Sequence, residues 1–365
     1  MVTTDTALLK TPLYQSHVAL GAKMAGFGGW LMPIQYGGIL LEHAHTRNAV
    51  SVFDICHMGE FLIEADAHTC GLDRVVTQNI VSMPVGSCRY GFMLNEQAGI
   101  VDDLIVYRLA AANWMLVVNA ATIANDEAHL KKYLTGAYRF QNVSDRKAKL
   151  DVQGPFSGEV LKSIFGAGID MLKYYSFADF TFQGNTYIIS RTGYTGERGY
   201  EVYVDSNSVF ALWNLLLQDP RVKPAGLGAR DTLRLEMGYP LYGQDIDTAH
   251  SPLAAGFEKF VDFSKDFIGK CALLAEKNKK LAERLVCFQA NSRKSPRHGS
   301  AIFSQGSRVG TVTSGSFSPS LLVGIGMGYV HASSAQVGAQ LIIKEGNSEL
   351  PVTIVKKPFW RKTSV

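Results

Sequence analysis

The sequence predicts an α+β protein with antiparallel sheets and, toward its C-terminal end, a small β-barrel or sandwich. Strand-like and helix-like stretches follow one another in irregular order, which argues against a doubly wound parallel sheet. Short apolar runs separated by turn residues fill the chain after residue 283. The length of 365 residues suits two or three domains, since one domain takes about 100–200 residues.

The first 135 residues combine helical spacing of apolar residues with the alternation typical of strands. Helices are expected at 15–24, 36–50, 66–77 and 121–135, and strands at 58–65, 89–94, 100–109 and 112–119. The block over 51–135 therefore follows the order β-α-β-β-β-α. That order suits an antiparallel sheet with helices on one face.

Further elements are expected between residues 149 and 240. A strand begins at 149–153, and Gly154-Pro155 separates it from a helix. The runs 180–182 and 186–191 flank Gln183-Gly184-Asn185, which is the pattern of a β-hairpin. A helix is expected at 207–218, and another begins near Gly228.

The stretch 273–283 has a helical pattern and is strongly charged, as expected for a solvent-exposed connector. Short strand-like runs separated by turn residues come after it. They occupy 284–290, 301–304, 308–314, 322–330, 338–344 and 350–356. Such closely spaced strands are typical of a small antiparallel barrel or sandwich, so a domain boundary is expected near residue 280.

The composition is that of a folded protein, since 47% of the residues are hydrophobic and 19% are charged. The net charge of +4 is too small to indicate a nucleic-acid partner, but it allows a modestly basic site for an anionic ligand. The cysteines are odd in number, widely spaced and without a Cys-x-x-Cys pair: Cys56, Cys70, Cys88, Cys271 and Cys287. This pattern favours reduced cytoplasmic thiols over a disulfide scaffold or a structural zinc site.

The start of the chain, from Met1 to Tyr14, lacks the basic and apolar segments of a secretory signal. The longest nearly uncharged apolar stretch covers only 321–330, whereas a membrane span needs about 20 residues. We therefore expect a cytoplasmic protein with neither a membrane nor a nucleic acid as partner.

Standard cofactor motifs are absent from the sequence. It has no GxGxxG between a strand and a helix, no GxxxxGK[ST], no HExxH and no EF-hand loop. His43 and His45 lie two residues apart on an expected helix, where such side chains do not share a face. No metal, flavin or nucleotide is therefore expected.

Two adjacent carboxylates interrupt the apolar run at 100–109. On a strand, one of Asp102 and Asp103 points inward and the other outward. An inward carboxylate among aliphatic neighbours must be hydrogen-bonded, paired with a charge, or functional. The alternative is a turn that ends a strand at these two residues, and the pattern leaves both open.

Three other segments are rich in polar and aromatic residues. Three glycines divide 190–203 and permit close backbone approach to a ligand, with a glycine-rich hairpin loop as the alternative. Segment 224–236 places basic and acidic residues beside leucines on an expected helix, where internal salt bridges are the alternative. The segment Lys356-Lys-Pro-Phe-Trp-Arg361 is basic with aromatic residues between the charges, and the alternative to a functional role is a solvated tail.

Together these segments resemble the aminomethyltransferase family, the T-proteins of the glycine cleavage system. The resemblance covers essentially the whole chain, through motifs in the family's order. The motifs are Lys10-Thr-Pro-Leu-Tyr14, Phe27-Gly-Gly-Trp-Leu-Met-Pro33, Phe53-Asp-Ile-Cys-His-Met-Gly-Glu60, residues 99–107, Arg191-Thr-Gly-Tyr-Thr-Gly-Glu197, Leu227-Gly-Ala-Arg-Asp-Thr-Leu-Arg-Leu-Glu236, Leu241-Tyr-Gly-Gln-Asp245, Thr313-Ser-Gly-Ser-Phe-Ser-Pro319 and the terminal Lys-Pro-Phe. Cys56 stands where the family usually has Ser, and Ala98 where it usually has Gly.

The resemblance implies three domains arranged as a cloverleaf around a tetrahydrofolate site, with the first two domains discontinuous. Residues 1–50 with 143–245 would form the first, folate-binding domain. Residues 51–142 with 246–279 would form the second, a ferredoxin-like α+β domain. Residues 280–365 would form the third, the C-terminal β-barrel.

The resemblance also implies an enzyme that transfers the methylene of aminomethyl-lipoyl H-protein to tetrahydrofolate. The reaction would release ammonia and give 5,10-methylenetetrahydrofolate and dihydrolipoyl H-protein, so tetrahydrofolate and the lipoylated H-protein are the expected partners. Alignment with the family makes Asp103 the expected catalytic carboxylate, with Asp102 as the fallback because the register of the strand decides which one points inward. Such a carboxylate would stabilise the positive charge that develops as ammonia leaves. The expected folate-binding residues are Tyr90, Asn119, Tyr194, Glu201, Arg230, Tyr239 and Arg361.

Two alternatives share the same fold. One is another folate-dependent one-carbon enzyme, such as a demethylase that acts without the lipoyl carrier. The other is a non-enzymatic folate-binding protein of iron–sulfur assembly, which carries a Lys-Gly-Cys-Tyr-type string where this chain has Arg191-Thr-Gly-Tyr194. Release of ammonia from aminomethylated H-protein distinguishes the three functions.

Overall fold

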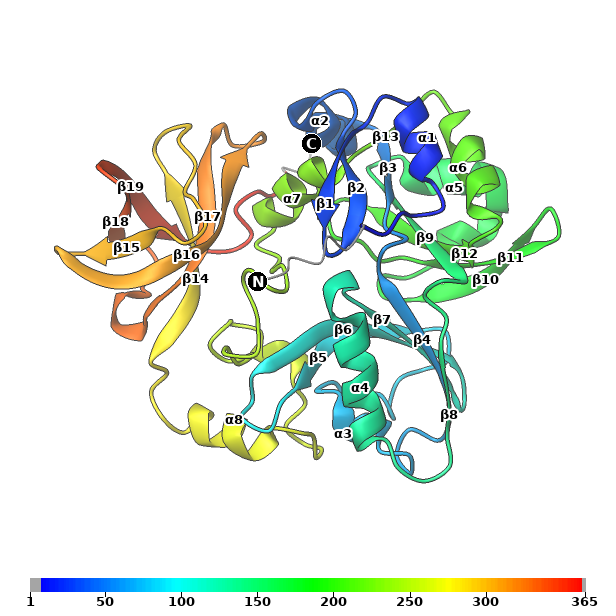
Figure 1. The fold of residues 1–365 in the computed structure, drawn as a ribbon, viewed down its shortest axis with the longest axis horizontal. Coiled ribbons are helices and arrows are strands. Elements are labelled where there is room, and N and C mark those ends of the chain that lie inside the picture. The colour runs from blue at the N-terminus through cyan, green and yellow to red at the C-terminus, as the bar shows by residue number, and fades with distance from the viewer. Residues whose placement is uncertain (1–7, 363–365) are drawn as a thin grey trace, which may run out of the picture.

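Two large sheets and a closed barrel form the three lobes of the computed structural model, which describes residues 8–362 (Figure 1). The barrel lies on the left of Figure 1, the six-stranded sheet at the upper right and the five-stranded sheet below. The α+β class, the antiparallel sheets and the C-terminal barrel are confirmed. The proposed domain boundaries stay a prediction, and their outer ends, 1–7 and 363–365, lie outside the described residues.

The N-terminal segment differs from the expectation of two helices. Helix α1 (Tyr14–Ala19) ends before residue 20 and is followed by an antiparallel hairpin of β1 (Lys23–Phe27) and β2 (Trp30–Gln35). Gly28 and Gly29 join these strands with φ of 56° and 87°, so each takes the left-handed conformation that a two-residue hairpin turn requires. Helix α2 (Ile39–Asn48) then matches the second expected helix.

The six-stranded sheet has the order β10-β11-β12-β9-β3-β13. Its strands are β3 (Val50–Asp54), β9 (Lys147–Gln153), β10 (Phe177–Phe182), β11 (Asn185–Ser190), β12 (Gly199–Asp205) and β13 (Val222–Pro224). The expected hairpin is present as β10 and β11, whereas part of the glycine-rich segment forms the central strand β12. Helices α5 (Ser157–Phe165) and α6 (Val209–Leu217) pack on the sheet, and Trp213 of α6 is fully buried in its core.

The five-stranded sheet has the order β5-β6-β7-β4-β8. It consists of β4 (Gly59–Glu64), β5 (Cys88–Leu94), β6 (Ile100–Ala110), β7 (Asn113–Val118) and β8 (Arg139–Asn142). Helix α4 (Ile123–Tyr133) matches its prediction, and the short 3₁₀ helix η1 (Ala120–Thr122) precedes it. Strand β6 continues through Asp102 and Asp103, so the alternative of a turn at these residues is wrong.

The helix expected at 66–77 is reduced to α3 (Leu72–Val75). The carboxylate of Asp66 accepts hydrogen bonds from the backbone N–H groups of His68 and Thr69, at 3.1 and 2.9 Å, and this local turn competes with a helix. Gly71 then takes a left-handed conformation, with φ of 77°. The spacing of apolar residues in the sequence gives no sign of such hydrogen bonds between a side chain and the nearby backbone.

The barrel closes in the order β14-β17-β16-β15-β18-β19. Its strands are β14 (Glu283–Ala290), β15 (Ala301–Ser304), β16 (Ser307–Ser318), β17 (Val323–His331), β18 (Gln340–Glu345) and β19 (Ser348–Val355). Helix α8 (Lys270–Lys277) leads into it, a shorter helix than the charged stretch predicts. Between residues 8 and 362, no helix has both the length and the apolar character that a membrane crossing requires.

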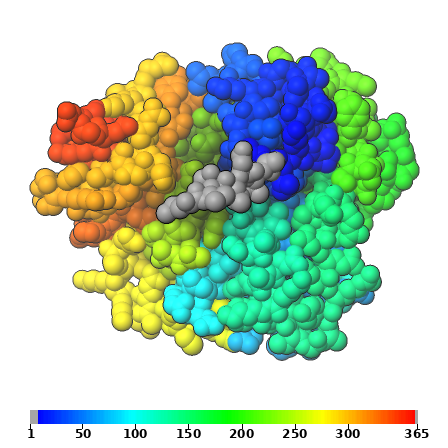
Figure 2. Space-filling model, viewed as in Figure 1, coloured from blue at the N-terminus to red at the C-terminus, as the bar shows by residue number. Residues whose placement is uncertain are grey.

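Buried polar contacts join the barrel to helix α7 (Leu227–Glu236), which belongs to the lobe with the six-stranded sheet. The Arg234 guanidinium pairs with Asp245 at 2.7 Å and donates to the Ser314 hydroxyl of β16 at 2.9 Å. The chain beyond β19 also returns to α7, where the N–H groups of Phe359 and Trp360 donate to the carbonyl of Glu236. In the space-filling view, the orange barrel, the green region of α7 and the blue N-terminal residues meet around a hollow near the middle of the face (Figure 2).

Candidate active site

The two adjacent aspartates of β6 occupy different environments, as the alternation of a strand requires. Asp102 is fully buried, whereas Asp103 is partly exposed. Their strand lies between β5 and β7, and Asp103 is paired in register with Phe92 of β5. Of the two carboxylates, Asp103 is therefore the one that retains access to a ligand.

Asp103 is held from two sides. The Tyr90 hydroxyl donates to Oδ2 at 2.9 Å, and the Asn119 amide Nδ2 donates to Oδ1 at 2.8 Å. Burial, and after it the negative charge of Asp102, raises the pKa of Asp103 to about 7. A carboxyl group with such a pKa can hold or release a proton near neutral pH.

Asp102 makes only internal contacts. It accepts hydrogen bonds from the Asn119 backbone N–H at 3.0 Å, from the Asn119 amide at 2.8 Å and from the Thr122 hydroxyl at 3.0 Å. It thereby fixes the start of η1 and the side chain of Asn119. Asn119 in turn bridges the two aspartates with the two N–H groups of one amide.

A second set of polar groups comes from the six-stranded sheet. Glu201 of β12 is paired with the buried ammonium of Lys149 on β9 at 3.1 Å, and the Thr192 hydroxyl donates to its other oxygen. Burial alone would raise the pKa of Glu201. The Lys149 ammonium, the Thr192 hydroxyl and the Arg230 guanidinium outweigh burial and hold this pKa below its usual value, so Glu201 is ionised.

Arg230 of α7 lies over the same sheet. Its guanidinium pairs with Asp151, which is fully buried on β9, two residues from Lys149. Burial outweighs this pairing and raises the pKa of Asp151 to about 6. Lys149, Asp151 and Gln153 alternate with Leu150 and Val152, so the polar face of β9 is directed to the site and the apolar face to the core.

Aromatic rings connect the two sets of groups. The rings of Tyr194 and Tyr239 are stacked, with centroids 5.8 Å apart and planes at 27°, and Arg230 lies 4.9 Å above the Tyr194 ring. Burial and the charge of Asp103 are among the causes that raise the pKa of Tyr194. Asp103 and Tyr194 are also among the groups whose charges act on Tyr194 and Tyr90, respectively, so the five-stranded sheet and the loop that carries Tyr194 approach each other here.

Arg361 is the expected site residue that the structure does not connect to this group. Its side chain is exposed and forms no hydrogen bond or ion pair with any part of the chain between residues 8 and 362. Its two neighbours do make contacts. The Trp360 ring stacks on the Arg47 guanidinium, and the Lys362 ammonium pairs with the Glu197 carboxylate at 3.3 Å. The role of Arg361 stays a prediction.

The sequence reasoning missed Lys149, Asp151 and Thr192, which complete the polar set around Glu201 and Arg230. The alternation Lys149-Leu-Asp-Val-Gln153 could have indicated the first two, because three polar side chains on one face of a buried strand need partners. Thr192 lies in a loop next to β11, where the sequence carries no periodic pattern.

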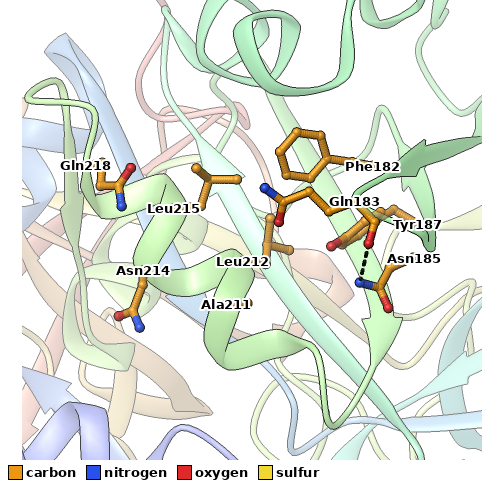
Figure 3. Close-up of a pocket in the computed structure, with 9 residues that line it drawn as sticks. All are labelled: Phe182, Gln183, Asn185, Tyr187, Ala211, Leu212, Asn214, Leu215 and Gln218. Atoms are coloured by element: carbon orange, nitrogen blue, oxygen red, sulfur yellow. Dashed lines mark hydrogen bonds between the residues drawn. The ribbon is translucent and has the colours of Figure 1, made fainter.

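A surface pocket of about 300 Å³ lies elsewhere, between the β10–β11 hairpin and α6 (Figure 3). Its lining is aromatic, aliphatic and amide in character: Phe182, Gln183, Asn185, Tyr187, Ala211, Leu212, Asn214, Leu215 and Gln218. It contains no carboxylate, lysine or arginine and none of the expected site residues.

Most of the chain matches two protein families. Residues 13–265 match the family described as the GCVT N-terminal domain, and residues 283–360 match the glycine cleavage T-protein C-terminal barrel domain. The chain is 43% identical to an aminomethyltransferase of Halothermothrix orenii over 96% of its own length and 99% of that relative's. It is 41% identical to an aminomethyltransferase of Phocaeicola vulgatus, again over 96% of this chain and 99% of the other.

A crystal structure of the glycine cleavage system aminomethyltransferase T from Bartonella henselae has the same fold. The TM-score is 0.92 at 34% sequence identity, and the superposition covers 97% of this chain and 98% of the other. The similarity therefore extends over both sheets and the barrel.

Proposed function

Because the chain belongs to the aminomethyltransferase family, the T-proteins of the glycine cleavage system, we propose that it passes a methylene group from the lipoyl arm of an H-protein to tetrahydrofolate. The donor is an aminomethyl group bound to a lipoyl sulfur. In the balanced reaction the C–S and C–N bonds of that group break, the acceptor loses two N–H protons, and these protons appear on the released thiol and on ammonia. The observation that supports the proposal most directly is the partly exposed Asp103 carboxylate, held by Tyr90 and Asn119.

The polar and aromatic groups of the site fit a reduced pterin. Tetrahydrofolate supplies the two nitrogen atoms that receive the methylene. The ionised Glu201 carboxylate is an acceptor suited to adjacent N–H groups on the edge of such a ring, and Lys149 keeps it ionised. Tyr194 and Tyr239 offer aromatic faces for a flat ligand, and Arg230 adds a donor beside them.

Asp103 is proposed as the catalytic carboxylate, with the sequence-based fallback Asp102 as a supporting group. An ionised carboxylate in a shielded site stabilises the positive charge that develops as ammonia departs. Tyr90 and Asn119 keep the oxygens of Asp103 in one orientation. Asp102 is less suited to this role because its oxygens already accept internal donors and its side chain is fully buried. The cytoplasmic location and the lack of a nucleic-acid partner stay predictions.

Turnover should rise with pH through an inflection near 7, because the pKa of Asp103 is raised to about 7 and the carboxylate is the active form. The measurement is the initial rate of folate-dependent ammonia release from aminomethylated H-protein between about pH 5 and 9. The inflection should be absent in Asp103→Asn. A rate independent of pH from 6 to 8 would contradict the role of Asp103.

The raised pKa of Asp103 also predicts how the stability of the protein changes with pH. The pKa of Asp103 is higher in the folded chain than the value of about 3.9 expected for unfolded Asp. Its contribution to the free energy of unfolding is therefore complete below about pH 4 and is lost as the pH rises through about 7. Asp103→Asn should be no less stable than the wild type at pH 8.

Glu201→Gln should weaken tetrahydrofolate binding by about 1–3 kcal/mol, which is roughly 5- to 150-fold in Kd. The amide is close in size to the carboxylate, but it accepts with only one atom and places its N–H groups against those of the pterin. Titration calorimetry of both proteins measures the difference. Asp205→Asn, at the exposed end of the same strand, is the matched control and should bind normally. Unchanged affinity in a folded Glu201→Gln protein would refute the assignment.

A further inference from the structure

Two buried tyrosines lie where the two sheets meet, and the proposed chemistry does not use them. Tyr107 of β6 belongs to the five-stranded sheet and Tyr203 of β12 to the six-stranded sheet. Both side chains are fully buried, and their hydroxyl oxygens are 2.9 Å apart. Buried hydroxyls are normally hydrogen-bonded, so the other contacts of this pair indicate what the two tyrosines hold in place.

The two tyrosine hydroxyls belong to a continuous chain of hydrogen bonds. The Tyr107 hydroxyl lies 3.1 Å from the hydroxyl of Ser190, the last residue of β11, and the Ser190 hydroxyl lies 2.7 Å from that of Thr192. The Thr192 hydroxyl in turn donates to Oε2 of Glu201. All of these side chains are buried. The chain therefore runs without a break from Tyr203 to the carboxylate proposed to bind the pterin.

The charge of Glu201 fixes the direction of every bond in this chain. An ionised carboxylate only accepts hydrogen bonds, so the single hydroxyl proton of Thr192 is directed at Glu201. Ser190 must then donate to Thr192, Tyr107 to Ser190, and Tyr203 to Tyr107. The other acceptor near the Ser190 hydroxyl, the backbone carbonyl of Glu201, is more distant at 3.5 Å. All the O–H dipoles of the chain thus point toward one negative charge, and hydrogen bonds aligned in this way strengthen one another.

We propose that Tyr107 is a positioning residue, whose hydroxyl acts through Ser190 and Thr192 to hold the Glu201 carboxylate in the orientation that receives the pterin edge. This inference rests on the proposed function, because it takes Glu201 as the acceptor for the pterin. The Lys149 ammonium lies 3.1 Å from Oε1 of Glu201, and Thr192 donates to Oε2. Each oxygen thus has one fixed partner in the protein and keeps a lone pair for a ligand.

Tyr107 anchors the chain from outside the sheet that carries Glu201. Strand β6 pairs with β5 and β7, whereas Ser190 of β11 and Glu201 of β12 are paired with each other in the six-stranded sheet. Tyr107 also follows Asp103 by four residues and lies on the same face of β6, because side chains alternate along a strand. One strand therefore carries both the proposed catalytic carboxylate and the anchor of the proposed pterin acceptor.

Titration calorimetry with tetrahydrofolate tests the chain one hydroxyl at a time. Phe in place of either tyrosine keeps the ring, and the two rings pack edge to face with centroids 5.6 Å apart. Tyr107→Phe should weaken binding by about 3–10-fold, as for the loss of one hydrogen bond, and Tyr203→Phe, one bond further from Glu201, should weaken it less. Thr192→Val is nearly isosteric but removes the donor to the carboxylate, so it should weaken binding by more than about tenfold. Thr192→Ser keeps the hydroxyl and should restore most of that loss.

A double-mutant cycle separates a chain of hydrogen bonds from a general loss of packing. In Thr192→Val the chain no longer reaches Glu201, so the addition of Tyr107→Phe should weaken binding by less than about twofold more. If Tyr107→Phe does not fold, Ser190→Ala takes its place in the cycle, because it interrupts the chain in the middle. Losses that multiply in the double variant, or wild-type affinity in a folded Tyr107→Phe or Thr192→Val protein, would overturn the proposal.

Tyr200→Phe is the matched control for the tyrosine variants. Tyr200 is a fully buried tyrosine of the same strand β12, but its hydroxyl accepts from the Arg198 guanidinium at 3.0 Å. This variant should bind tetrahydrofolate normally. A loss equal to that of Tyr107→Phe would show that any buried tyrosine hydroxyl has the same effect, and it would refute the specific role of the chain.

Turnover tests whether Tyr107 positions the folate acceptor or takes part in the chemical step. Asp103 keeps its own donors, Tyr90 and Asn119, in Tyr107→Phe. The KM for tetrahydrofolate should therefore rise with Kd, while kcat at saturating tetrahydrofolate stays within about threefold of the wild type. A fall in kcat without a rise in KM would overturn the positioning role. Wild-type protein that does not bind tetrahydrofolate would refute the proposed function, whereas wild-type binding with unlinked losses in the cycle would refute only the chain.

Discussion

Asp103→Asn is expected to lower turnover by about 10²–10³-fold, which corresponds to roughly 3–4 kcal/mol of transition-state stabilisation. Asn is nearly isosteric and still accepts the hydrogen bond of Tyr90, but it has no charge to offset the cation that develops as ammonia leaves. Folate affinity should change little. Single-turnover release of ammonia from aminomethylated H-protein measures the chemical step, and a folate titration measures binding.

Asp102→Asn is the comparison that separates the neighbouring roles. Asp102 accepts three internal donors and is fully buried, so its loss should lower stability and reduce turnover less than the loss of Asp103. A large loss of turnover in Asp102→Asn with near-normal turnover in Asp103→Asn would reverse the assignment. Near-normal turnover in both variants would mean that positioning of the reactants alone carries the reaction.

Asp245→Ala is expected to lower the free energy of unfolding by about 3–5 kcal/mol, because it leaves the buried guanidinium of Arg234 with only the half-exposed carboxylate of Asp231 as a counter-ion. The Asp245 carboxylate also accepts the Leu241 N–H at 3.0 Å and the Ser314 hydroxyl at 2.8 Å, so the variant also loses contacts between the barrel and α7. Urea unfolding followed by far-ultraviolet circular dichroism measures the loss.

The second partner of Arg234 provides the control. Asp231 pairs with the same guanidinium at 2.8 Å, but its side chain is 46% exposed. Exposed pairs contribute about 0–1 kcal/mol, so Asp231→Ala should have a small effect. Equal effects of the two substitutions would show that the buried pair does not hold the barrel to α7.

Much of the fold could be predicted from the sequence, because the stretches with regularly spaced apolar residues are long enough to distinguish helices from strands. The strands β4 to β7, the hairpin β10–β11 and the barrel strands were each predicted from alternation or from turn residues. The hairpin β1–β2 was not predicted, since its paired glycines lie in a short segment between helical patterns. Strand β3 was not predicted either. It is buried over its whole length, and a fully buried strand shows no alternation of apolar and polar residues.

The site was harder to predict from residue patterns than the fold. A pair of aspartates in an apolar strand indicated that one of them had a special role, but the register that makes Asp103 the accessible one depends on pairing with β5. The family resemblance supplied Glu201 and Arg230, and the structure places both in one polar network with Lys149 and Asp151.

The position of β3 has a consequence for synthesis of the chain. Its partners in the sheet, β9 and β13, begin at residues 147 and 222, whereas β3 ends at residue 54. At about 5–20 residues per second, the ribosome needs roughly 5–20 s to make the residues between β3 and β9. During that time the strands from β4 to β8 can pair with one another, but both edges of the apolar strand β3 stay unpaired. We therefore expect the nascent chain to be exposed to aggregation through β3 while residues 55–146 are being made.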